Sequence, residues 1–295
     1  TLITPHLGKT ETTILWELRL PRFVAAALVG CMLGLSGAIL QGVPRNGLAD
    51  PSLVGISQGA SLLVVGLIVT WPTAPVELRP IAGFVGALLT ATLVQWVAAG
   101  KTTTASLRFV LVGIGASATI SAGTNAMLTY GQINQASAAL AWLAGSVRTV
   151  SWRDCTVLAT GFALLLPSVI WASRPLAAMR FGPEIAIGLG LNLRRYRNLL
   201  VLTAVALAAL SVSIVGPLGF IGLIAPHLAR RLVRRGVGGQ LIATALVGSA
   251  LVTLADLVGR TAFAPIQLPE GLISAAIGAP VFILIIFKRA GPQRL

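Results

Sequence analysis

The sequence predicts an all-α polytopic membrane protein with nine transmembrane helices. Its 295 residues are 56% hydrophobic and only 10% charged, whereas a soluble protein carries about 25% charged residues. The apolar residues form long runs without a charge, and a helix needs about 20 apolar residues to cross a bilayer. Lipid offers the backbone no hydrogen bonds, so these runs are expected to be helices. The alternating pattern of a membrane barrel is absent from them.

The charge-free runs cover residues 23–44, 51–76, 80–100, 109–147, 155–173, 198–226, 236–255 and 271–287. The first predicts a span that runs inward from about Pro21 to Val43. The second goes outward to the proline-rich turn WPTAP, and the third returns inward to Lys101.

The run 109–147 predicts a fourth span, directed outward and ending near Tyr130. The segment that follows is semi-polar, and its Trp142 and Trp152 suit a membrane interface. We therefore expect a short helix at the outer surface there. The fifth span then returns inward to Ser173.

The run 198–226 is long enough for one span and most of a second, because Gly216–Pro217 breaks it. We expect the sixth span to end at this break and the seventh to return inward into the sequence RRLVRR. The eighth goes outward to Arg260, and the ninth returns to Lys288. Four spans precede the fifth and four follow it from the opposite side, which is the arrangement of an inverted repeat.

The basic residues set the orientation. The net charge is +14, and with the N-terminus outside 15 of the 22 Lys and Arg residues fall inside. This bias obeys the positive-inside rule. It explains the excess of basic charge, so no nucleic-acid partner is expected. Cys31 and Cys155 fall within or at the edge of spans, which predicts neither a disulfide nor a metal site.

A polar segment, residues 174–198, interrupts the apolar chain between the fifth and sixth spans. It is too charged to enter a bilayer and too short to be a domain. Two short apolar patterns broken by glycines lie in it, one over 183–189 and one from Leu191 onward. We interpret them as short amphipathic helices on the cytoplasmic face, presented for a partner to bind.

The chain is not expected to be an enzyme. Gly100–Lys101–Thr102 is similar to the end of a phosphate-binding loop, but Gln95 stands where that loop needs a glycine. Any ATP that drives the protein must therefore be bound by another chain. Ala26, Gly30, Gly34 and Ala38 form a stripe at four-residue spacing, which lets helices approach closely in lipid.

Few titratable groups lie inside the predicted spans. Asp256 is the one carboxylate, and Arg260, one turn further along the helix, can pair with it. His227 is predicted to be packed or hydrogen-bonded. An ion-driven transporter would place more acids or histidines in its spans, so this alternative is weak. Arg19, Arg22 and Arg260 lie at outer span ends, either as interfacial anchors or as docking charges for an acidic partner.

Three long motifs resemble the FecCD-type permeases, the membrane subunits of bacterial ABC importers for iron–siderophores, haem and vitamin B12. They are LWELRLPRFVAAALVGCMLGLSGAILQGVPRNGLADPSLVGISQGAS, SVSIVGPLGFIGLIAPHLARRL and LPEGLISAAIGAPVFILII. The resemblance implies an inverted-repeat permease of a type II ABC importer in the bacterial inner membrane, formed by residues 1–295 as one domain. The family has ten spans, which implies that a first span precedes this chain.

The resemblance also implies partners and site residues. The segment 174–198 would hold the cytoplasmic coupling helices that seat in the ATPase subunits, with Phe181, Gly182, Pro183, Glu184, Gly188 and Gly190 in the motif. Arg19, Arg22 and Arg260 would pair with glutamates of a periplasmic binding protein. Two permease chains, identical or paralogous, and two ATPases that bind ATP and Mg would complete the importer, with no cofactor in this chain. The pathway would be lined by the fourth, seventh and ninth spans. A ferric siderophore is the expected cargo, with haem or vitamin B12 as alternatives. A purely structural membrane scaffold is a remote alternative function.

Overall fold

A computed structural model describes residues 12–98, 105–233 and 236–290, and within these ranges the chain is helical, without strands. Its elements are η1 (Ile14–Arg19), α2 (Leu20–Gly42), η2 (Pro51–Val54), α3 (Ile56–Thr70), α4 (Leu78–Ala98), α5 (Ala105–Tyr130), α6 (Ile133–Leu143), α7 (Trp152–Met179), α8 (Pro183–Gly188), α9 (Leu193–Val215), α10 (Ile221–Leu232), α11 (Val237–Thr261) and α12 (Glu270–Ala290). The predicted end of the third span at Lys101 and the segment Gly100–Thr102 lie outside the described residues.

The all-helical membrane fold is confirmed, but the count of nine transmembrane helices is not. Six helices of the described ranges are long and apolar enough to cross a bilayer: η1 with α2, α4, α5, α7, α9 and α11. Two further helices, α3 and α12, have shorter apolar stretches. Each predicted span coincides with a helix, yet the one at the seventh, α10, has only 12 residues. A complete span needs about 20.

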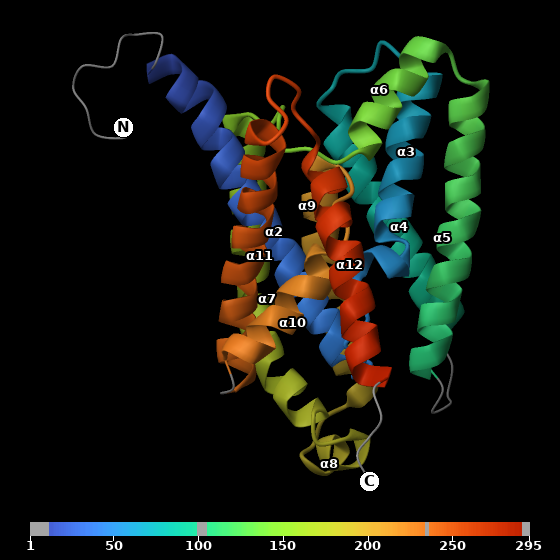
Figure 1. Ribbon diagram of the computed structural model, residues 1–295. Helices are drawn as coiled ribbons and strands as arrows, with labels where there is room; N and C mark the ends of the chain where they lie inside the picture. The colour runs from blue at the N-terminus through green and yellow to red at the C-terminus, as the bar shows by residue number, and fades with distance from the viewer. Residues whose placement is uncertain (1–11, 99–104, 234–235, 291–295) are drawn as a thin grey trace.

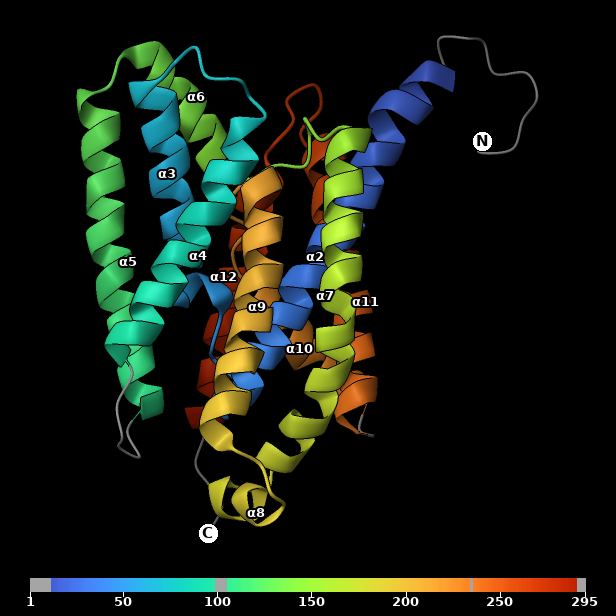
Figure 2. The same ribbon diagram turned by 180° about the vertical axis from the view of Figure 1, so that it is seen from behind.

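Two connections turn back into the bundle and explain why α3 and α10 are short. After α2 the chain reverses at Arg45, with φ 55°, and leads to η2. The Asp50 side chain caps η2 by accepting from the Ser52 amide at 2.8 Å. After α9 the chain reverses at Gly216, with φ 78°. Figures 1 and 2 show that α3 and α10 begin inside the bundle and not at its ends.

The packing follows the predicted inverted repeat. Helices α2 and α9 contact each other at the centre of the bundle. Helix α11 packs on α2, as α4 packs on α9, and α10 packs on α11, as α3 packs on α4. Figures 1 and 2 place α5 at one edge of the bundle and α11 at the opposite edge.

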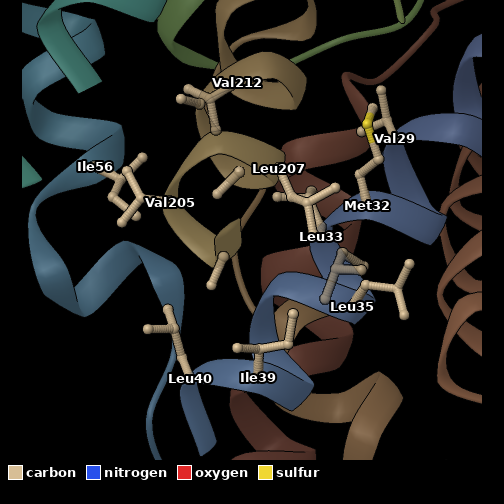
Figure 3. Packing of buried hydrophobic residues seen from close by; sticks show 14 of the residues in the cluster. Val29, Met32, Leu33, Leu35, Ile39, Leu40, Ile56, Val205, Leu207 and Val212 are labelled. Carbon is tan, nitrogen blue, oxygen red and sulfur yellow. The ribbon is translucent and has the colours of Figure 1, made fainter. Parts of the chain in front are cut away.

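The core lies where α2 and α9 meet. Figure 3 shows Met32 and Leu33 of α2 beside Leu207 of α9, and Ile56 of α3 beside Val205 of α9. These side chains are 0–3% exposed. Hydrophobic burial gives little drive between helices in lipid, so close van der Waals packing must hold them.

Glycines make the closest helix contacts possible. A Cβ on Gly30 of α2 would stand 2.2 Å from the carbonyl oxygen of Gly248 on α11. A Cβ on Gly37 would stand 1.8 Å from the carbonyl oxygen of Gly222 on α10. Beside the first contact, the Ser249 hydroxyl donates to the carbonyl of Ala27 at 2.7 Å. The predicted role of the small-residue stripe is therefore confirmed.

Candidate functional site

Helix α8 is a short helix at one end of the bundle, which is the lower end in Figure 1. Its neighbours are the end of α7 and the start of α9. Helix α7 continues past the predicted end at Ser173 to Met179. The second apolar pattern of the polar segment does not form a separate helix, because α9 already begins at Leu193. Helix α8 is therefore the one helix that lies entirely within residues 174–198.

Glycines fix the direction of α8 at both ends. Gly182, with φ 112°, precedes Pro183, the first residue of the helix, and Gly190, with φ 84°, follows it. Residues that carry a side chain rarely adopt these backbone conformations with positive φ. The amide of Leu191 donates to the carbonyl of Ala186 at 3.1 Å and closes the turn. Ala186 is fully buried, so the helix rests on the bundle through this residue.

The remaining side chains of α8 and its flanks point outward. Phe181 is 69% exposed and Ile185 is 52% exposed, and Ile187 and Leu189 are exposed to a similar extent. Glu184, in the first turn, is also exposed. Contiguous exposed apolar side chains rimmed by polar residues mark interaction sites. These side chains can therefore fit into an apolar groove or pocket of a partner.

The sequence analysis named Phe181, Gly182, Pro183 and Glu184 here, and the structure places all four at the start of α8. Gly188 ends the helix, and a Cβ there would meet nothing within 4 Å. Ile185, Ile187 and Leu189 belong to the predicted apolar pattern 183–189 but were not named among the coupling residues. Their placement within a segment too charged for the bilayer was the available signal.

At the opposite end of the bundle, Arg22 of α2 joins two carboxylates from distant parts of the chain. Its Nε pairs with Oδ1 of Asp256 on α11, and its Nη2 donates to Oε1 of Glu270 on α12 at 2.9 Å. Its Nη1 also donates to Oε1 of Gln267 at 3.2 Å. The Arg22 side chain is only 12% exposed. It therefore ties three helices together.

Glu270 and Arg260 complete this cluster. The Glu270 side chain is 1% exposed, and its Oε2 accepts from the Val147 amide at 2.8 Å. Nε of Arg260 lies 3.6 Å from Oδ2 of Asp256. The predicted pairing of Asp256 with Arg260 is thus confirmed. The closer pairing of Asp256 with Arg22 was not predicted. Two cations and two carboxylates balance, as buried charges require.

The three arginines predicted to dock a partner therefore differ in their surroundings. Arg19 ends η1 and is exposed. Arg260 is partly exposed, whereas Arg22 is largely buried in the cluster. His227, predicted to be packed, lies in α10 with a partly buried side chain.

Helix α5 has an unusually uncovered surface. Only 11% of its most apolar 18-residue stretch is buried inside the bundle, against 72% for the corresponding stretch of α9. It is also the least apolar of the six long helices. A helix that is both uncovered and less apolar is poorly suited to face lipid alone. This face suits a partner helix or an aqueous pathway.

Comparison with known proteins gives one consistent result. The model of the FecCD transport family matches residues 2–288. The chain is 41% identical over 282 residues to the Fe(3+)-citrate import system permease protein YfmE of Bacillus subtilis, covering 95% of this chain and 84% of that protein. It is 39% identical to the achromobactin transport system permease protein CbrC of Dickeya dadantii, covering 94% and 79%.

A solved structure shares the fold. It is described as an inward-facing conformation of a metal-chelate type ABC transporter. It matches with a TM-score of 0.85 and 27% sequence identity over 98% of this chain and 92% of the other. The similarity extends over the bundle as a whole.

Proposed function

Because the chain belongs to the FecCD transport family, we propose that it is the permease subunit of an ATP-driven importer that carries a ferric siderophore across the bacterial inner membrane. The observation that carries this proposal is the exposed apolar surface of α8 at the basic end of the bundle. The chain supplies one wall of the pathway, and its partners supply energy and cargo.

Energy is delivered through α8. A pair of separate ATPase subunits, which bind ATP and Mg, seat Phe181 and Ile185 in a surface groove. Closure of the ATPases on ATP pushes α8. Since α8 follows α7 and precedes α9, the push is transmitted to both spans. Gly182 and Gly190 support this role, because their backbone conformations set the angle at which α8 leaves the bundle.

Cargo is delivered at the opposite end. A periplasmic binding protein docks there through acidic residues that face Arg19 and Arg260. Arg22 has a structural role instead, because its guanidinium group already binds Asp256, Glu270 and Gln267. It holds α2, α11 and α12 in place beneath the docking surface.

The pathway lies between two permease chains, along α5, α10 and α12. The uncovered, less apolar face of α5 supports this placement. The second permease, identical or paralogous, covers that face. The pathway itself belongs to neither chain alone.

A proton-driven secondary transporter is the runner-up from another class. Asp256 would have to release and bind protons during transport. In the structure both of its carboxylate oxygens are already engaged, Oδ1 by Arg22 and Oδ2 by Arg260, so proton transfer would have to break these two ion pairs. The ATP-driven mechanism is therefore preferred.

Cargo is tested in a bacterial strain that lacks the gene for this chain. Uptake of a radiolabelled ferric siderophore is measured beside uptake of haem and of vitamin B12, with and without the restored gene. We expect restoration of ferric siderophore uptake alone, in line with the iron chelates named for the relatives. Restoration of haem or vitamin B12 uptake instead would assign the alternative cargo.

A further inference from the structure

A pocket among the ends of α2, α7, α10 and α11 is used by none of the roles above. Its volume is about 340 Å³, within the range of about 300–1,000 Å³ that ligand sites occupy. Arg180, which lines it, directly precedes the turn into α8. The pocket therefore lies at the same end of the bundle as α8.

The polar lining of this pocket is cationic. It comprises three arginines, two glutamines and one threonine: Arg45, Arg180, Arg230, Gln41, Gln240 and Thr244. Among the described residues that line the pocket, none is an Asp or a Glu. Close cations repel one another strongly when they are partly removed from water. An anion bound among them would relieve this repulsion.

Neutral acceptors hold the arginines in place. Arg230 Nη2 donates to Oε1 of Gln41 at 2.7 Å, and the Gln41 amide nitrogen donates to the carbonyl of Gly222 at 3.1 Å. Arg180 donates to Oε1 of Gln240. These amide oxygens orient the guanidinium groups and carry no charge themselves, so the described lining residues bring three positive charges and no negative one to the pocket.

Arg45 extends the pocket toward α8. It donates to the backbone carbonyl of Arg180. Its Nη1 lies 3.8 Å from where a Cβ on Gly182 would stand. The guanidinium group has five N–H donors, of which this bond uses one. A bound anion would thus link α2 to the junction between α7 and α8.

We infer that this pocket binds a phosphate group, as carried by an anionic phospholipid of the cytoplasmic leaflet. Guanidinium groups match the geometry of phosphate oxygens and bind them in a bidentate manner. Basic pockets between transmembrane helices on the cytoplasmic side are typical sites for anionic headgroups. Ala38, Leu176 and Leu241 line the same pocket and suit the apolar part of a lipid. The assignment is independent of the cargo.

Native mass spectrometry of the full-length permease, purified in detergent, tests this inference. The protein is titrated with phosphatidylglycerol, with phosphatidylcholine and with inorganic phosphate alone. We expect preferential retention of phosphatidylglycerol. The double variant Arg45→Gln with Arg230→Gln should lose about tenfold in affinity, since charge-assisted hydrogen bonds are removed. Arg45→Lys with Arg230→Lys keeps the charge but not the bidentate geometry, so its affinity should lie between those of the wild type and the double Gln variant.

Arg194→Gln is the matched control, because Arg194 is exposed at the same end of the bundle and does not line the pocket. It should leave binding unchanged. Tight binding of inorganic phosphate that excludes phosphatidylglycerol would support the phosphate site and identify a soluble source. Equal affinity in wild type and the double Gln variant, or an equal loss with Arg194→Gln, would overturn the inference.

Discussion

Arg22 and Glu270, 248 residues apart in the chain, meet at 2.9 Å between Nη2 and Oε1 at the outer end of the bundle. Their contact joins the start of α2 to the start of α12. Because Glu270 also accepts from the Val147 amide, the connection before α7 is fixed to the same point. These contacts make this end of the bundle one mechanical unit.

The first prediction concerns the Arg22–Glu270 contact. Glu270→Ala leaves Arg22 short of a partner and the Val147 amide without an acceptor, so it should lower the free energy of unfolding by about 3 kcal/mol or more. Thermal denaturation of the purified permease measures this. Glu77→Ala is the control, because its pair with Arg153 is exposed at 3.7 Å and should contribute less than about 1 kcal/mol. Equal effects would contradict the role given to Glu270.

The second prediction concerns helix packing. Gly30→Ala places a Cβ against the Gly248 carbonyl, so α2 and α11 must separate, at a cost of about 1–3 kcal/mol. Gly238→Ala, in the first turn of α11, meets nothing within 4 Å. It should be neutral or stabilise by up to about 1 kcal/mol through helix propensity. Denaturation midpoints compare the two, and an unaffected Gly30→Ala protein would refute the close contact.

The third prediction concerns α8. Phe181→Ser with Ile185→Ser removes two exposed apolar anchors, so the ATPase subunits should bind at least about 30-fold more weakly, as loss of an interface anchor implies. The melting temperature should hardly change, because both side chains are outside the core. Ile133→Ser at the opposite end is the control, since Ile133 is 84% exposed. ATPase affinity that survives the double substitution would exclude α8 as the seat.

The fourth prediction separates Arg19 from Arg22. Arg19→Glu should slow association of the periplasmic binding protein, and the difference should shrink as salt is added, because exposed charges act by steering. Arg22→Gln should instead lower the melting temperature, since it leaves Asp256 and Glu270 with less positive charge. Surface plasmon resonance and thermal denaturation give the two readouts. The opposite pairing of effects would reverse the two roles.

Much of the fold could be predicted from local sequence. Runs without charge marked α2, α4, α9 and α11, and the glycine stripe marked the face of α2 that meets α11. Run length, however, reports composition and not the path of the chain. It predicted the break at Gly216, but it did not reveal that the segment after α2 turns back into the bundle, because that turn has its positive φ at Arg45 and not at a glycine.

The site was predicted in part. The contrast between a charged segment and its apolar flanks marked the position of α8. The cluster around Arg22 was missed because Glu270 lies just before the predicted ninth span and far from Arg22 in sequence. The topology held the signal, since it places Arg22, Asp256 and Glu270 at the same end of three spans.

The most direct test of the central claim is uptake into proteoliposomes that contain two permease chains and the ATPases, with the binding protein outside. Transport of a radiolabelled ferric siderophore is followed with ATP enclosed, and separately with a proton gradient alone. Uptake should require ATP, persist with an uncoupler and fail with the Phe181→Ser, Ile185→Ser variant. Uptake driven by the proton gradient without ATP would contradict it.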